Sequence, residues 1–131
     1  MKIAVDTNIL IRLITADDPK QLKLVEKLIR EYDGHGQIFI SLLVVQEVYW
    51  VLEHFYNWKK EDILNAIEDI LRAKQFFIEH ELAVKMAVSK SRKNEEFSDA
   101  LIGQVGALKN LKTYTFDRGV KDDVAFVILG E

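Results

Sequence analysis

The chain has 131 residues, of which 49% are hydrophobic and one is proline, and its formal net charge is −3 at pH 7. This length fits one globular domain, residues 1–131, and the composition excludes a disordered or fibrous protein. Cysteine is absent, which excludes disulfides, thiolate metal sites and cysteine nucleophiles. Without a signal peptide or an apolar stretch long enough to cross a bilayer, we expect a cytoplasmic protein with no membrane association.

The acidic balance argues at first against a nucleic-acid partner, because phosphate binding usually shows as an excess of basic residues. If four of the 21 acids neutralise bound cations, however, the remaining acids no longer outnumber the 18 lysines and arginines. Polyanion binding is therefore permitted by the composition, although it is not indicated by it.

Short apolar segments alternate with longer segments of helical periodicity along the chain. In chain order, the pattern predicts a strand over 2–5, a helix over 7–14, a helix from Pro19 to Asp33-Gly34, a strand over 37–41, a helix over 42–56, a helix over 59–72, a strand over 75–78, a helix through 82–87 that ends in a basic cluster, a helix over 98–108, and strands over 112–116 and 125–129. This alternation is typical of an α/β sandwich built on a mainly parallel sheet.

Several of these helices start at residues that favour N-capping. Asp6 or Thr7 caps the first helix, Asp18 precedes Pro19 at the start of the second, and Ser41 and Ser98 precede two others.

Two acids follow predicted strands at opposite ends of the chain, Asp6 after 2–5 and Asp117 after 112–116. Because ligands of open parallel sheets bind outside the carboxyl ends of the strands, these two carboxylates suggest a metal site. Each has a structural alternative, since aspartate is a favoured helix N-cap and Asp117-Arg118-Gly119 is an ordinary turn sequence.

Glu47 lies on the predicted helix 42–56, and its neighbours three and four residues away are apolar. We expect this carboxylate to interrupt a buried apolar face, where it needs protonation, a basic partner or a metal ion. A salt bridge is the structural alternative.

Asp99 lies in the first turn of the helix 98–108, where the helix dipole alone favours an acid. The same helix contains Gly103 and Gly106. Interior glycines cost about 1 kcal/mol each relative to alanine unless close backbone approach requires them. Close packing of this helix on the sheet would bring Asp99 toward the strand ends.

In this order and at these separations, the motifs resemble those of the PIN-domain ribonucleases, most closely the VapC-type toxins of toxin-antitoxin pairs. The resemblance covers essentially the full chain and rests on Val5-Asp6-Thr7-Asn8, Glu47, Phe97-Ser98-Asp99-Ala100 and Thr115-Phe116-Asp117-Arg118. It implies a three-layer α/β/α sandwich with a mainly parallel five-stranded sheet, in which the first and fourth strands are neighbours.

The resemblance also implies an activity, the metal-dependent hydrolysis of RNA phosphodiester bonds at a site built from Asp6, Glu47, Asp99 and Asp117, with Asn8 and Thr115 in support. Oxygen ligands without cysteine or histidine favour Mg²⁺ or Mn²⁺. The candidate RNA contacts are basic side chains, for which solvated surface is the structural alternative: Arg12, Lys90, Arg92, Lys93 and Arg118. The pair Asp122-Asp123 is interpreted as a solvated turn.

Two other functional classes are weighed against the nuclease. A haloacid-dehalogenase-like phosphatase would need Asp-x-Asp after the first strand, where this chain has Asn8, and it gives Glu47 no role. A non-catalytic binding module would use the acids only as caps and salt bridges, and a stand-alone PIN nuclease would lack an antitoxin.

The resemblance implies a small cognate antitoxin as partner. The aromatic residues of 50–58 exceed what one helix turn and a loop easily bury, so we expect them either to finish the core or to form a homodimer or antitoxin surface: Trp50, Phe55, Tyr56 and Trp58.

Overall fold

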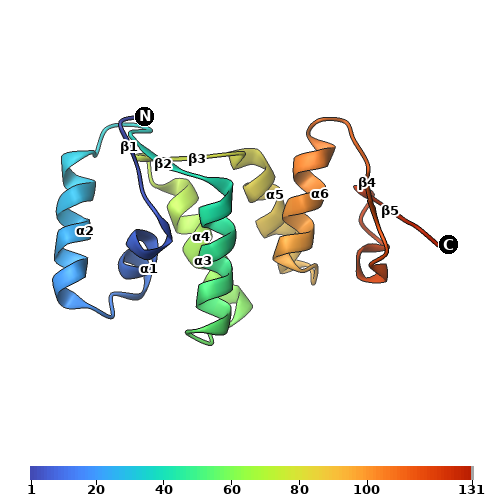
Figure 1. Ribbon diagram of the computed structural model, residues 1–131, viewed down its shortest axis with the longest axis horizontal. Coiled ribbons are helices and arrows are strands. Elements are labelled where there is room, and N and C mark those ends of the chain that lie inside the picture. Colours follow the sequence, from blue (N-terminus) through green and yellow to red (C-terminus); the bar gives the residue numbers. More distant parts are fainter. Residues whose placement is uncertain (131) are drawn as a thin grey trace. The chain divides into compact units, whose positions relative to one another are not determined.

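The computed structural model describes residues 1–130 (Figure 1). The described chain forms two compact units, Met1–Glu79 and the part from His80 onward, and each is described by itself. In chain order the first unit contains β1 (Ile3–Ala4), α1 (Thr7–Thr15), α2 (Pro19–Glu31), β2 (Ile38–Ile40), α3 (Leu42–His54), α4 (Lys60–Arg72) and β3 (Phe76–Ile78). The second unit contains α5 (Glu81–Arg92), α6 (Phe97–Ala107), β4 (Thr113–Thr115), the 3₁₀ turn η1 (Arg118–Val120) and β5 (Phe126–Ile128).

The sheet of the first unit is parallel and has the order β1-β2-β3. Ile38 on the central strand β2 pairs with Ile3 of β1 and with Phe76 of β3. Ile38 and Ile40 are fully buried on one face of β2, and Phe39 on the other face is half-buried. Helices α1 and α2 connect β1 to β2, and α3 and α4 connect β2 to β3. The prediction of parallel strands joined by helices is therefore confirmed in this unit.

The helix starts of the first unit follow the predicted caps. The side chain of Asp6 accepts a hydrogen bond from Ile9 N at 3.1 Å, and Asp18 accepts one from Gln21 N at 3.1 Å. Ser41 Oγ accepts from Val44 N at 3.2 Å. Each cap satisfies a backbone N–H that has no partner within its helix.

In the second unit, α5 packs against α6, and β4 pairs in parallel with β5. Thr113 is opposite Phe126, and Thr115 is opposite Ile128. The five predicted strands thus all form, and the fold class is α/β as predicted, but their pairings fall in a three-stranded and a two-stranded sheet, not in one five-stranded sheet. The expected neighbour relation of the first and fourth strands would join the two units, and it stays a prediction.

Helix α6 approaches the two-stranded sheet closely at its glycines. A Cβ atom on Gly103 would lie 2.6 Å from a ring carbon of Phe126, and one on Gly106 would lie 2.8 Å from Thr113 Oγ1. The prediction that these glycines permit close packing on the sheet is therefore confirmed.

The predicted cap at Ser98 is wrong. Helix α6 already begins at Phe97, with Glu96 at the N-cap and no side-chain capping bond. Asn94 has a φ of 79°, in the left-handed region, which turns the chain directly after α5. Phe97 is buried in the core, and its burial favours the earlier start of the helix.

Within residues 1–130, no helix combines the length and the apolar character that crossing a bilayer would require.

Candidate active site

Asp6 and Glu47 are brought to the same end of the first unit. Asp6 follows β1, is exposed, and caps α1. Helix α3 packs against α1, and Thr7 Oγ1 donates a hydrogen bond of 2.9 Å to Glu47 Oε1. The carboxylate of Glu47 is thereby held beside the residue that follows Asp6. Asn8 is exposed in the first turn of the same helix α1.

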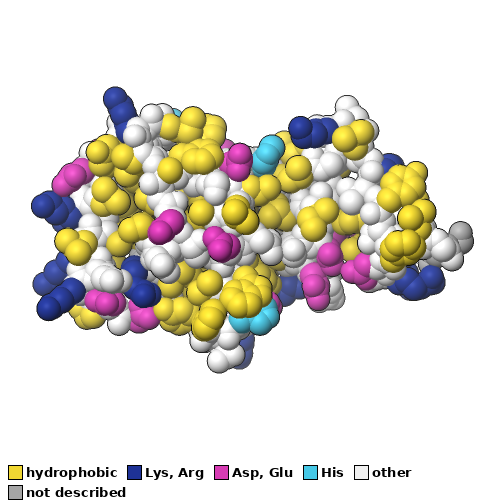
Figure 2. Space-filling model, viewed as in Figure 1, with side chains coloured by type: hydrophobic (Ala, Val, Ile, Leu, Met, Phe, Trp, Pro, Cys, Tyr) yellow, Lys and Arg dark blue, Asp and Glu magenta, His cyan; other side chains and the backbone are white. Residues whose placement is uncertain are grey.

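The expected burial of Glu47 is wrong, because Glu47 is exposed. The apolar face of α3 that includes Glu47 lies at the surface, where Leu43 is 69% and Trp50 48% exposed. Figure 2 shows hydrophobic side chains exposed over α3, beside acidic and histidine side chains. The buried face of α3 is a different one: Val45, Val48, Tyr49 and Leu52. Because Glu47 is exposed, its charge carries no large burial cost. Burial therefore gives no reason to expect protonation, a basic partner or a metal ion at Glu47.

Glu79 was not singled out from the sequence. It follows β3, and its Oε1 accepts a hydrogen bond of 2.9 Å from Leu42 N at the start of α3. This acid satisfies one of the open N–H groups of the helix that carries Glu47, in addition to the cap by Ser41. Its role is to fix α3 against the end of the sheet.

Asp99 and Asp117 are brought together in the second unit. Asp99 is partly buried in the first turn of α6. Burial raises its pKa, and the negative charges of Asp117 and Glu96 and a hydrogen bond with Asp117 raise it further. Two carboxyl groups within hydrogen-bond reach share a proton or attract a cation. This pair is the chemically most distinctive feature among the four acids.

Asp117 is held by the turn in which it lies. Its Oδ1 accepts a hydrogen bond from Gly119 N at 2.8 Å, so it caps η1 as its turn sequence indicated. Its own backbone N–H donates to Thr115 Oγ1 at 3.0 Å. Thr115 therefore orients the segment that presents the Asp117 carboxylate.

Each unit thus supplies two of the four acids. Among residues 1–130, no three Asp, Glu or His side chains are grouped closely enough to hold a metal ion. The gathering of all four acids in one site stays a prediction. The donor chemistry fits a hard divalent cation, because the Asp99–Asp117 pair offers only carboxylate oxygens that repel each other when both are ionised.

Two of the candidate RNA contacts are held by acids of their own unit. Arg12 Nη1 lies 3.4 Å from Asp17 Oδ1, and its Nε donates to Gln21 at 2.6 Å. The hydrogen bonds from Tyr56 and Thr15 lower the pKa of Asp17, which keeps this acid charged beside Arg12. In the second unit Lys90 is paired with Asp123. Arg92, Lys93 and Arg118 are exposed residues of the same unit.

The interpretation of Asp122-Asp123 as a solvated turn is correct for Asp122 and wrong for Asp123. Asp122 is exposed, but Asp123 is only 5% exposed. Its side chain is covered within the second unit, where it pairs with Lys90 and accepts a hydrogen bond from Ala125 N. The turn directs Asp123 inward and Asp122 outward, and the sequence of the turn does not show which of the two is buried.

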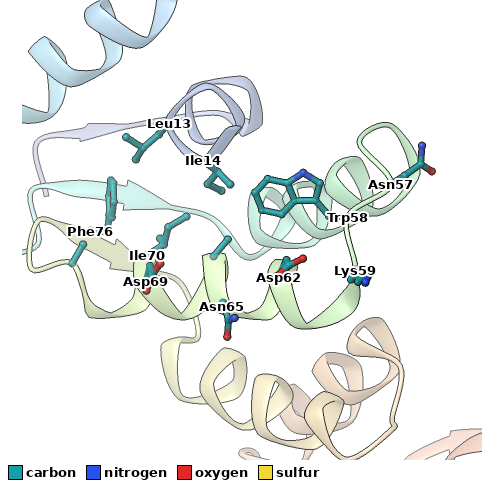
Figure 3. A pocket seen from close by; sticks show the side chains of 12 residues that line it. Leu13, Ile14, Asn57, Trp58, Lys59, Asp62, Asn65, Asp69, Ile70 and Phe76 are labelled. Carbon is teal, nitrogen blue, oxygen red and sulfur yellow. The ribbon is translucent and has the colours of Figure 1, made fainter. Parts of the chain in front are cut away.

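A pocket of about 700 Å³ in the first unit lies between the last turn of α1, the loop after α3 and helix α4 (Figure 3). Its apolar lining includes Leu13, Ile14 and Trp58, and Asp62 and Asp69 line it from α4. The pocket is at the opposite end of α1 from Asp6 and is lined by none of the four acids. It is therefore a surface separate from the candidate active site.

The comparisons with known proteins show the family of the chain. The family model for the PIN domain matches residues 3–126, which include all four acids, and the chain belongs to the PIN-domain family. It is similar to a VapC ribonuclease of Aquifex aeolicus (strain VF5), with 28% identity over 123 residues that cover 92% of this chain and 84% of the relative. The resemblance drawn from the motifs is thereby confirmed.

A solved structure described as a toxin-antitoxin complex from Klebsiella pneumoniae is also similar, with 19% identity, coverage of 97% of this chain and 96% of the other, and a TM-score of 0.34.

Proposed function

We propose that this protein is a Mg²⁺- or Mn²⁺-dependent endoribonuclease that hydrolyses RNA phosphodiester bonds and is the toxin of a type II toxin-antitoxin pair. Membership of the PIN family and the similarity to a VapC ribonuclease support the class of activity. The observation that carries the proposal is the pairing of Asp99 with Asp117, two acids from separate segments held within hydrogen-bond reach.

The four acids have distinct tasks in this proposal. Asp6 and Asp117 are the principal ligands, and Asp99 and Glu47 complete the shell or orient water. A divalent cation held by these acids would lower the pKa of the attacking water and stabilise developing negative charge. Asp99 and Asp117 share a hydrogen bond in the ion-free chain, so cation binding releases a proton and the affinity rises with pH.

The chain's own residues supply orientation and proton transfer. Glu47 is exposed and is held through one oxygen by Thr7 Oγ1, which leaves its other oxygen to accept a proton from water as general base. Thr115 orients Asp117 through its backbone, and Asn8 supports Asp6. Arg92, Lys93 and Arg118 are candidates for phosphate contacts because their side chains are exposed.

The proposal is tested with Asp6→Asn and Asp99→Asn, each of which removes one charge with little change of shape. Cleavage of a fluorogenic RNA oligonucleotide in Mg²⁺ or Mn²⁺ is expected to fall at least about 100-fold in either variant, on the scale of losing a transition-state contact. Asp122→Asn is the matched control and is expected to cleave like the wild type, because Asp122 is exposed and forms no hydrogen bond to the paired acids. Undiminished cleavage by both test variants would reject the assignment.

Metal binding separates the nuclease from a binding module whose acids serve only as caps. Mn²⁺ is expected to raise the melting temperature of the wild type by mass action, and less so that of Asp99→Asn. Equal melting temperatures with and without Mn²⁺ would favour the capping alternative.

The partners we propose are RNA, a cognate antitoxin and a second copy of the chain, in the cytoplasm. The exposed apolar side chains of α3 and its C-terminal end support a protein-binding surface, since Leu43 and Phe55 are 69% and 70% exposed. Light scattering of the purified chain, alone and co-expressed with the product of a neighbouring reading frame, distinguishes a homodimer from a toxin-antitoxin complex. A monomer in both experiments would contradict this part of the proposal.

A further inference from the structure

The second unit contains a buried acid that the proposed nuclease site does not use. Asp123 lies between η1 and β5, and its side chain is almost fully covered. Its Oδ1 accepts two hydrogen bonds, from Lys90 Nζ at 3.1 Å and from Ala125 N at 2.9 Å. Its Oδ2 is also buried, yet no N–H or hydroxyl group within the described residues donates to it. A buried carboxylate oxygen needs a donor, because leaving it without one is costly.

The carboxyl group of Glu95 is the donor that the second unit offers. Glu95 and Asp123 lie within hydrogen-bond reach of each other. Two carboxyl groups form such a bond only when one of them carries a proton. Burial, followed by the hydrogen bond to Asp123 and the charge of Asp123, raises the pKa of Glu95 to about 7.

The opposite pKa shifts of the two acids favour Glu95 over Asp123 as the carrier of the shared proton. Burial disfavours ionisation of Asp123, but the hydrogen bonds from Ala125 N, Glu95 and Lys90 outweigh burial and hold its pKa below the ordinary value. Lys90 also favours ionisation of Glu95, whereas Asp123 and Asp99 oppose it. Lys90 from α5, Asp123 from the turn before β5 and Asp99 from α6 are charged groups that act on Glu95.

The three members of the cluster come from segments that carry the paired acids. Lys90 is in the last turn of α5, and Glu95 lies two residues before α6, which presents Asp99 in its first turn. Asp123 follows η1, which Asp117 caps. A link between Glu95 and Asp123 therefore fixes the distance between the start of α6 and the segment after β4.

We propose that Lys90, Glu95 and Asp123 form a clasp that positions Asp99 against Asp117, and that the clasp holds only while Glu95 carries a proton. When Glu95 ionises, two carboxylates face each other across a single lysine, and their repulsion opens the link. Glu95 and Asp123 are positioning residues and not ligands. The effect on cleavage rests on the proposed nuclease function, whereas the clasp itself does not.

The clasp is tested by carbon-detected NMR titration of the carboxyl groups in the full-length, metal-free chain. In the wild type, Glu95 is expected to titrate near 7, and the Asp99 carboxyl signal is expected to shift in the same pH range. In Asp123→Asn, the titration of Glu95 is expected to move down by at least about one unit, because Lys90 then acts on Glu95 alone. Asp122→Asn is the matched control and is expected to titrate like the wild type.

Substitution of Glu95 separates a positioning role from a merely structural one. In Glu95→Gln, the side-chain amide donates to Asp123 Oδ2 at every pH. The Asp99 carboxyl signal is therefore expected to lose the shift that accompanies the titration of Glu95, while the fold is kept. Glu95→Ala has no side-chain donor and is expected to lower cleavage about 10–100-fold, the usual effect of losing a residue that orients a ligand. Glu95→Gln is expected to retain the cleavage activity.

A wild-type Glu95 that titrates in the ordinary range of glutamate would overturn the clasp, and so would indistinguishable behaviour of Glu95→Gln and Glu95→Ala. A chain that shows the expected titrations but cleaves no RNA would overturn the nuclease proposal alone.

Discussion

Replacing Asp123 by alanine is expected to destabilise the protein strongly, whereas the same replacement at Asp122 is expected to change little. Asp123 is buried and accepts hydrogen bonds from Lys90 and Ala125, and Asp122 is exposed. The two positions are adjacent and have the same side chain. The comparison therefore isolates the effect of burial and pairing.

The magnitude follows from the contacts that are lost. Breaking a buried ion pair by removing one partner costs about 3–5 kcal/mol. Lys90 is partly exposed and can turn its ammonium group toward water, which lowers this cost. The N–H of Ala125 loses its acceptor, which adds about 1–3 kcal/mol if the group stays buried. We expect a net loss of about 2–3 kcal/mol for Asp123→Ala and less than about 0.5 kcal/mol for Asp122→Ala.

Urea and thermal unfolding followed by far-ultraviolet circular dichroism measure both variants against the wild type at pH 6. A loss of 2–3 kcal/mol corresponds to a decrease in melting temperature of roughly 6–12 °C for a chain of this size. Melting of both variants within about 1 °C of the wild type would refute the reasoning, because it would mean that the Lys90–Asp123 pair adds nothing to folding.

Two further predictions concern pH and helix capping. The pKa of Glu95 is 4.5 in the unfolded chain and about 7 in the folded chain. Between these two pH values the unfolded state therefore binds fewer protons than the folded state, and the free energy of unfolding falls as the pH rises. We expect this decrease in the free energy of unfolding to be on the order of 1–2 kcal/mol, since Glu95 remains partly exposed. Urea unfolding of Glu95→Gln at pH 5 and pH 8 should show no such decrease. An equal decrease in the variant would contradict the assignment to Glu95. Ser41→Ala should cost about 1 kcal/mol because Ser41 caps α3, and Ser98→Ala should cost less than about 0.5 kcal/mol because Ser98 caps no helix; equal losses would contradict the capping assignments.

Local features of the sequence predicted most of the secondary structure. The caps at Asp6, Asp18 and Ser41 are confirmed, because a capping bond joins residues three apart and needs no distant partner. The five short apolar strands are confirmed with narrower bounds. Gly103 and Gly106 were interpreted correctly, because a glycine inside a helix has few explanations other than close approach. Ser98 was misassigned, because Phe97 begins the helix one residue earlier.

The environment of each acid was decided by tertiary structure. Glu47 lies among apolar neighbours in the sequence, yet it is exposed, because the side of α3 that packs inward is the one with Val45, Val48 and Leu52. Asp123 lies in a sequence typical of a solvated turn, yet it is buried and pairs with Lys90 from α5. Helical periodicity places a residue on a face of its helix, but which face is covered depends on elements far away in the sequence.

The sequence by itself determined the order and identity of the acids, the local geometry of their helix starts and the α/β class of the fold. Only the tertiary structure brings Asp99 within hydrogen-bond reach of Asp117 and Glu95 within reach of Asp123. A pKa depends on burial and on charges within a few ångströms. Those distances arise when α5, α6 and the turn before β5 pack together, and the spacing of residues along the chain does not specify them.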